Sequence, residues 1–143
     1  MPCRLAELNK VDCVKESTGD IRRISLIRDR LGDRVGVFCG WEDISWESFV
    51  AGANGWVCVC ANFAPRMAVD LYKQTAVNKA YQAGWDICQK PLPSLRFLES
   101  GKLIQTTKSF QSVRDIKDGF SRSPLISEEV KKVLTIVEIT QIN

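Results

Sequence analysis

Lys15 is the residue of this sequence whose type and position most directly suggest chemistry. It follows a short, mainly apolar run at residues 11–14, which has the length of a buried strand. A lysine held at the apolar end of a strand can act as an amine nucleophile toward a carbonyl carbon. The position of Lys15 is therefore compatible with Schiff-base chemistry on a carbonyl substrate.

A structural interpretation of Lys15 competes with the chemical one. Charged side chains at strand ends are usually solvated, and Glu16 is adjacent in the sequence. Judged from position alone, a solvated Lys15 paired with Glu16 is favoured over a catalytic lysine.

Histidine is absent from the chain, and this absence excludes Ser-His-Asp catalysis, Cys-His catalysis and His-ligated metal sites. The six cysteines lie mostly within apolar stretches, where a free cysteine behaves as a small buried hydrophobe. Cys58 and Cys60 form the only close pair, whereas a zinc site needs a second pair or histidines at ligand spacing. We therefore expect reduced cysteines, no metal and no cofactor.

Alternating strand and helix patterns would position these residues. Three apolar runs have the length of buried strands: residues 11–14, 35–39 and 56–60. Asp20 can cap a helix that ends at Gly32, a shorter helix closes at Gly52, and Pro65 starts a third. Strands that alternate with helices indicate βα units and a parallel sheet, so the predicted fold class is α/β.

Beyond Pro65 the pattern is helical, with no further bounded strand. The expected helices cover residues 76–88, 92–98 and 127–137. In parallel βα architectures, ligands bind where the loops gather at the carboxyl ends of the strands. Three loops qualify here: residues 15–20, 40–43 and 61–65.

The composition fits a soluble globular protein. The formal net charge is only +3, and basic and acidic residues are mixed. No apolar run approaches the roughly 20 residues of a membrane span. We therefore expect a cytoplasmic protein that binds neither nucleic acid nor membrane. A basic nucleic-acid-binding module would depend only on four scattered arginines: Arg22, Arg23, Arg28 and Arg30.

Three segments follow one another in a distinctive order. Residues 14–20 combine Val-Lys-Glu with Gly-Asp, residues 37–43 carry a glycine and an acidic pair, and residues 52–65 contain a glycine-rich turn that leads to Asn-x-x-Pro. Their order and separations resemble the dihydrodipicolinate synthase and N-acetylneuraminate lyase family of class I aldolases. A weaker similarity to the C-terminal lysine helix and Arg-x-Pro loop of that family involves Lys108, Gly119, Arg122 and Pro124.

The resemblance implies roles for five residues. Lys15 corresponds to the lysine that forms the imine with a 2-oxo acid such as pyruvate. Gly40 corresponds to the glycine that lines the substrate pocket, and Val57 to the position whose backbone carbonyl faces the active site. Glu42 and Asp43 lie where the family places polar residues toward the second substrate. Without the resemblance, Gly40 is a strand-ending turn, Val57 is core, and the acidic pair caps a helix.

The resemblance also implies the architecture. We expect a partial TIM (β/α)8 barrel of about three C-terminal βα units over residues 1–76, followed by a C-terminal helical region over residues 77–143. A complete barrel has roughly 250 residues, so the first five strands of the family are not matched. The family's carboxylate-binding Ser/Thr loop, its relay tyrosine and its entrance arginine are not matched either.

Two functions follow from this resemblance. The leading hypothesis is a lyase of the aldolase type that acts through a lysine Schiff base on pyruvate or a related 2-oxo acid and is incomplete on its own. The alternative is a non-catalytic truncated paralogue or half-barrel that acts in protein-protein assembly. Trp41 departs from the family's Gly-Asp-Asp loop, so a sugar acid is as good a second substrate as aspartate semialdehyde. Because three strands cannot close a barrel, we expect a homo-oligomer or a complementing chain.

Overall fold

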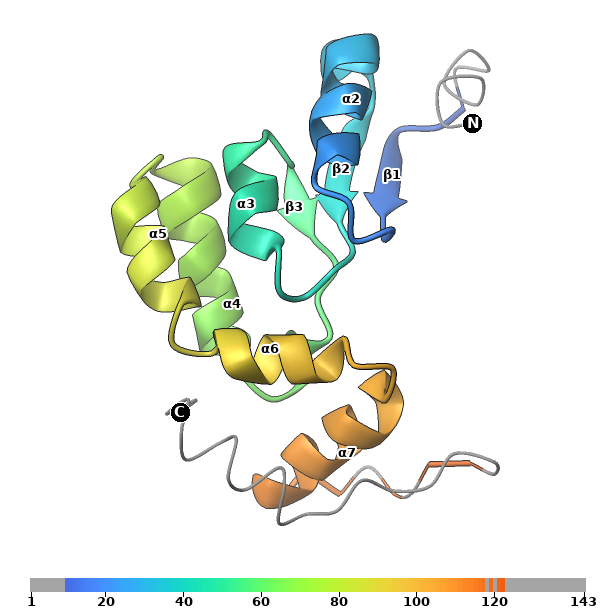
Figure 1. Cartoon of the computed structure of the whole chain (residues 1–143), viewed down its shortest axis with the longest axis vertical. Coiled ribbons are helices and arrows are strands. Elements are labelled where there is room, and N and C mark those ends of the chain that lie inside the picture. The colour runs from blue at the N-terminus through green and yellow to red at the C-terminus, as the bar shows by residue number, and fades with distance from the viewer. Residues whose placement is uncertain (1–9, 118, 120, 123–143) are drawn as a thin grey trace.

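One small parallel sheet organises the chain. The structure, a computed structural model, describes residues 10–117, 119, 121 and 122. Three strands lie in the order β1–β2–β3 (Figure 1): β1 Cys13–Glu16, β2 Gly36–Cys39 and β3 Gly55–Trp56. The predicted α/β fold with a parallel sheet is therefore confirmed, while the predicted fraction of a barrel stays a prediction.

Helix α2 (Arg22–Leu31) connects β1 to β2. Its buried side chains share one face: Ile24, Ile27 and Leu31. At its start the Asp20 carboxylate accepts a hydrogen bond from the Arg22 amide at 3.1 Å. Gly32 ends it with a φ of +56°, a left-handed conformation that favours glycine, and opens the short 3-10 turn Gly32–Arg34 (η1). The predicted helix between Asp20 and Gly32 is confirmed.

Helix α3 (Ser45–Val50) connects β2 to β3, and Gly52 follows it with a φ of +98°, close to the predicted end. Two strand predictions need correction. Strand β1 starts at Cys13 rather than at residue 11, so Lys15 lies inside the strand. The third strand was predicted over residues 56–60, but pairing ends at Trp56.

The early end of β3 has a local cause. The backbone amides of Val59 and Cys60 donate hydrogen bonds to the side chain of Glu42, at 2.7 and 3.1 Å, instead of to a neighbouring strand. The chain then turns into the 3-10 segment Cys60–Asn62 (η2). A buried side chain thus replaces strand pairing at this point.

Five helical segments follow η2 in the described chain: α4 Pro65–Tyr72, the π-helical segment η3 Lys73–Val77, α5 Tyr81–Cys88, α6 Leu92–Leu98 and α7 Leu103–Val113. Pro65 starts α4, as predicted, and α6 has the predicted bounds. The predicted helix over residues 76–88 is interrupted before Tyr81, where Lys79 adopts a φ of +57°. The apolar pattern did not predict α7, and the helix predicted at residues 127–137 lies outside the described residues.

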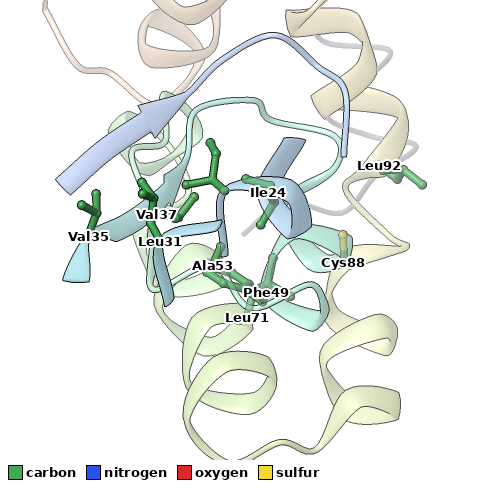
Figure 2. Close-up of a cluster of buried hydrophobic side chains, with 10 residues drawn as sticks. Ile24, Leu31, Val35, Val37, Phe49, Ala53, Leu71, Cys88 and Leu92 are labelled. Carbon is green, nitrogen blue, oxygen red and sulfur yellow. The ribbon is translucent and has the colours of Figure 1, made fainter. Parts of the chain in front are cut away.

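Two groups of buried side chains hold the elements together. The first joins one face of the sheet to the helices α2 to α5 and extends to Leu92 (Figure 2). The second surrounds η2, where Phe63 stacks on Phe110 of α7 with ring centroids 4.5 Å apart. Both groups contain residues from each side of position 76. The expected partial barrel and the expected C-terminal helical region, which meet at that position, therefore share buried contacts. In the described segments, none of the helices combines the length and apolar character needed to cross a membrane.

Candidate active site

Lys15 lies on the face of the sheet that the helices leave open. It pairs in register with Phe38, whereas its neighbours Val14 and Glu16 pair with Val37 and Cys39. Because side chains alternate along a strand, Lys15 and Phe38 lie on one face while the buried Val37 and Cys39 lie on the other. Lys15 itself is exposed rather than enclosed by apolar side chains.

Gly40 allows the Lys15 side chain to lie against the end of strand β2. A Cβ atom built on Gly40 would stand 2.5 Å from Cε and 2.8 Å from Cγ of Lys15, and closer still to the Ser17 hydroxyl. These separations are too short for real Cβ contacts. The structure thus brings Lys15 and Gly40 together, and a larger residue at position 40 would displace the lysine.

Glu42 is buried and holds the turn after β3. Its carboxylate accepts hydrogen bonds from the amides of Val59 (2.7 Å) and Cys60 (3.1 Å), and its side chain is 2% exposed. Burial raises the pKa of Glu42 above its ordinary value, while these hydrogen bonds and the Lys15 charge act in the opposite direction. Lys15 and Glu42 therefore influence each other electrostatically.

Glu99 is a second carboxylate of this site, and the sequence did not indicate it. It follows α6, and its Oε1 accepts a hydrogen bond from the Glu42 amide at 2.7 Å. Burial and the nearby carboxylates of Glu42 and Asp43 raise the pKa of Glu99, whereas the Glu42 amide and the Lys15 ammonium lower it. One signal was available, because a glutamate at a helix carboxyl end opposes the helix dipole and so suggests another role.

Asp43 and Val57 lie beside these residues with different contacts. Asp43 Oδ2 is 4.0 Å from Nε of Arg96 in α6, and its Oδ1 is buried without a hydrogen-bond partner in the described part of the chain. The Val57 amide donates to the carbonyl oxygen of Cys39 at 2.9 Å, and its side chain is 48% exposed. The alternative interpretation of Val57 as a core residue therefore disagrees with its exposure.

The Glu16 carboxylate points away from Lys15. It accepts hydrogen bonds from Nε of Arg23 and from the Thr18 amide, both at 2.8 Å. Burial acts to raise the pKa of Glu16, but these two partners outweigh it and hold the pKa below its ordinary value. Glu16 thus pairs with Arg23, so the alternative in which it neutralises Lys15 loses its basis.

Two nearby arginines form ion pairs, and the Trp41 ring contacts a neighbouring loop. Arg22 and Arg28 form ion pairs with Asp20 (2.7 Å) and Asp33 (2.6 Å), so these arginines of the scattered basic set are already paired. The Trp41 ring lies 3.2 Å from the Cβ position of Gly19, in the loop that follows β1. Across the described residues, no group of His, Cys, Asp and Glu could hold a metal ion.

Comparisons with known proteins point to one family. The sequence profile of the dihydrodipicolinate synthetase family matches residues 3–142. The 4-hydroxy-tetrahydrodipicolinate synthase of Geotalea uraniireducens is 26% identical over 137 residues, which cover 94% of this chain and 47% of that protein. The enzyme of the same name from Anaplasma marginale is 34% identical over 80 residues, 56% of this chain and 26% of its own length.

Solved structures agree with this match. A protein from Pseudomonas aeruginosa assigned as a dihydrodipicolinate synthetase superposes with a TM-score of 0.88 at 27% identity, over 99% of this chain and 50% of that one. The dihydrodipicolinate synthase of Acinetobacter baumannii gives 0.89 at 24% identity, over 99% and 49%. The chain therefore spans about half the length of these proteins. With a family profile that covers almost all of its residues, it belongs to the dihydrodipicolinate synthetase family.

Proposed function

We propose that this chain supplies the imine-forming lysine of an aldolase-type lyase, with Lys15 as the nucleophile and a 2-oxo acid such as pyruvate as the carbonyl substrate. The observation that carries the proposal is the packing of Lys15 against Gly40 at the carboxyl ends of parallel strands, where βα proteins bind ligands. The relatives named 4-hydroxy-tetrahydrodipicolinate synthase support it, as does the A. baumannii structure, whose protein is in complex with pyruvate.

Imine formation needs few groups. The neutral Lys15 amine adds to the ketone carbon, and the carbinolamine loses its oxygen as water to give the C=N bond. Departure of water requires a proton, and Glu99 is a carboxyl group close enough to Lys15 for their charges to interact, with a pKa that burial raises. We assign Glu99 this proton-donating role, while Glu42, committed to two backbone amides, fixes the turn and the local charge.

The remaining predicted residues receive narrower roles. We propose that the backbone at Val57 borders the substrate and that Asp43, with its unpartnered buried oxygen, orients polar groups on the second-substrate side. The Trp41 ring packs over Gly19, so it shapes the entrance next to the β1 loop. A sugar acid and aspartate semialdehyde both stay open as second substrates.

We further propose that steps beyond the imine depend on additional βα units. The relatives are about twice as long, and the edge strands β1 and β3 each have one neighbour among the described strands. Aldol addition also requires oriented groups, and the carboxylate-binding loop and relay tyrosine of the family are not matched in this chain. The isolated chain should therefore form an imine without appreciable turnover.

Borohydride reduction in the presence of pyruvate tests the proposal. The intact mass should increase by one reduced pyruvate per chain, and the extent should saturate with pyruvate concentration. Lys15→Arg keeps the positive charge but cannot form an imine, so it should abolish the adduct. Lys73→Arg, a change at an exposed lysine in η3, is the matched control and should leave the adduct intact. An adduct that persists in Lys15→Arg would remove the proposal.

A further inference from the structure

Cys58 and Cys60 form a pair of thiols beside the sheet edge and are separated by one residue. Cys58 is half-buried and lines a cavity of about 480 Å³ together with Phe38 and Ala61. Cys60 is 0% exposed and lies in the buried group around η2. One thiol is thus reachable from a cavity while the other is fully buried.

The backbone between the two cysteines brings their Cα atoms within the range of a disulfide. Val59 adopts a φ of −77° and a ψ of −34°, the right-handed helical conformation. Residues on either side of a helical residue are about 5.4 Å apart at their Cα atoms. Disulfides most often join Cα atoms about 5.5 to 6 Å apart, whereas an extended residue would give roughly 6.6 Å, near the upper limit.

The two thiols interact with each other unequally. Their hydrogen bond lowers the pKa of Cys58, and it raises the pKa of the buried Cys60. Thiolate, not thiol, is the attacking species in disulfide exchange. Because the cavity reaches Cys58 and Cys60 is fully buried, Cys58 is the entering nucleophile and Cys60 is the thiol placed to resolve a bond formed on it.

We propose that Cys58 and Cys60 are a reversible dithiol–disulfide site that exchanges with small disulfides entering through the cavity beside Phe38. The Cys58 thiolate attacks one sulfur of the small disulfide, and the first small thiolate leaves. The Cys60 sulfur then attacks the Cys58 sulfur, and the second small thiolate leaves with the Cys60 proton. Two electrons pass from the pair to the small disulfide, which becomes two thiols.

The two cysteines lie next to Glu42, whose charge interacts with that of Lys15. The Val59 and Cys60 amides that bind Glu42 lie within the ring that the disulfide would close. The other buried thiols lack this arrangement: burial raises the pKa of Cys39, and it raises the pKa of Cys88 to about 11. The thiol chemistry itself does not depend on Lys15.

Exchange with oxidised glutathione tests the proposal on the whole chain. The reduced protein is incubated with oxidised glutathione, quenched with iodoacetamide and mapped by peptide mass spectrometry. Cys58 and Cys60 should appear joined and free of glutathione, and dithiothreitol should restore both thiols. Cys88 is the internal control. Its free thiol should disappear at least roughly tenfold more slowly than that of Cys58.

Two variants separate the steps of the exchange. In Cys60→Ser the reaction should stop at the mixed disulfide, so Cys58 should retain one glutathione. In Cys58→Ser the buried Cys60 should remain a free thiol. The wild-type experiment does not depend on the folding of any variant. A glutathione retained on wild-type Cys58 would overturn the proposal. A free Cys58 thiol that disappears no faster than the free Cys88 thiol would also overturn it.

Discussion

At the scale of single residues, the position of the Lys15 side chain depends on the absence of a side chain at Gly40. The nearest atoms to a Cβ at that position belong to two flexible side chains, those of Lys15 and Ser17. Both can rotate away without moving the backbone. A substitution here should therefore disturb the chemistry more than the fold.

Gly40→Ala should slow pyruvate trapping at Lys15 by roughly tenfold, because a misplaced nucleophile loses its orientation toward the carbonyl. The thermal midpoint should change little. The rate is measured by borohydride trapping and intact mass. Gly36→Ala in the same strand is the matched control, since its Cβ would stand 3.5 Å from the nearest atoms, an ordinary contact. Equal rates in the two variants would show that Gly40 does not position the lysine.

The buried carboxylates predict opposite pH dependences. The pKa of Glu42 is raised in the folded chain, so its contribution to stability is present below the ordinary value of 4.5 and is lost as the pH rises through the folded value. The pKa of Glu16 is lowered, so its contribution is present above 4.5 and is lost as the pH falls through the folded value.

Unfolding by urea between about pH 3 and pH 8 measures these contributions. The free energy of unfolding of wild type minus that of Glu42→Gln should decrease as the pH rises. The same difference for Glu16→Gln should increase over the acidic part of that range. Parallel pH profiles for the two variants would contradict the burial and pairing assigned to these carboxylates.

The sequence could indicate some site residues and not others for physical reasons. Lys15 and Gly40 belong to short local motifs, so the resemblance to the family could single them out, although position alone favoured a structural role for each. Glu99 joins the site through a hydrogen bond to Glu42 across 57 positions, a contact set by how α6 packs against the sheet. The partner of Glu16 was also missed, since adjacent strand residues face opposite sides and the strand bounds were misplaced.

At the scale of elements, close packing of α5 on η3 joins the C-terminal helices to the rest of the fold. Gly84 of α5 is buried, and a Cβ there would clash with the Thr75 hydroxyl and approach Cδ1 of Trp46 at 3.3 Å. Thr75 is 0% exposed, so it has no room to move into solvent. This contact fixes the distance between the two segments.

Gly84→Ala should lower the free energy of unfolding by about 1 to 3 kcal/mol, because the added methyl overpacks the contact between α5 and η3. Ala83→Ser, one residue away on the exposed side of α5, should change it by no more than about 0.5 kcal/mol. Chemical denaturation of both variants measures the difference. An unchanged stability in Gly84→Ala would mean that the helices separate easily at this point.

Element types were easier to predict than element ends. Helices α2 and α6 have strong apolar periodicity, and glycine, proline or aspartate marks the ends of α2 and the start of α4. The end of β3 depends on the Glu42 side chain, and the break before α5 depends on the left-handed conformation of Lys79. Neither leaves a local signal in the sequence.

At the scale of the whole molecule, apolar side chains gather where the sheet ends at β3. Val57 is 48% exposed, and Val69 and Tyr72 of α4, 47% and 38% exposed, line the cavity beside this edge. An edge strand with unpaired backbone groups next to apolar surface favours association with another chain. We expect a second copy of the chain to cover it reversibly, so that small disulfides reach Cys58 in the dissociated chain.

Light scattering at micromolar concentration should therefore detect a dimer or larger species. Val69→Glu should shift the protein toward monomer, because a buried, unpaired carboxylate opposes association. Leu26→Glu changes a side chain of similar exposure, 44%, on α2 and should leave the association unchanged. A stable wild-type monomer, or equal effects of the two variants, would contradict the assignment of this surface.

The distribution of label among the lysines of one wild-type sample shows directly whether Lys15 is the imine-forming residue. The chain is reduced with borohydride at limiting pyruvate, digested and mapped by peptide mass spectrometry. Lys10 and Lys73, both exposed, serve as internal references within the same chain. Reduced pyruvate should accumulate on Lys15 well before either reference is labelled. Equal labelling of the three lysines, or labelling that omits Lys15, would contradict it.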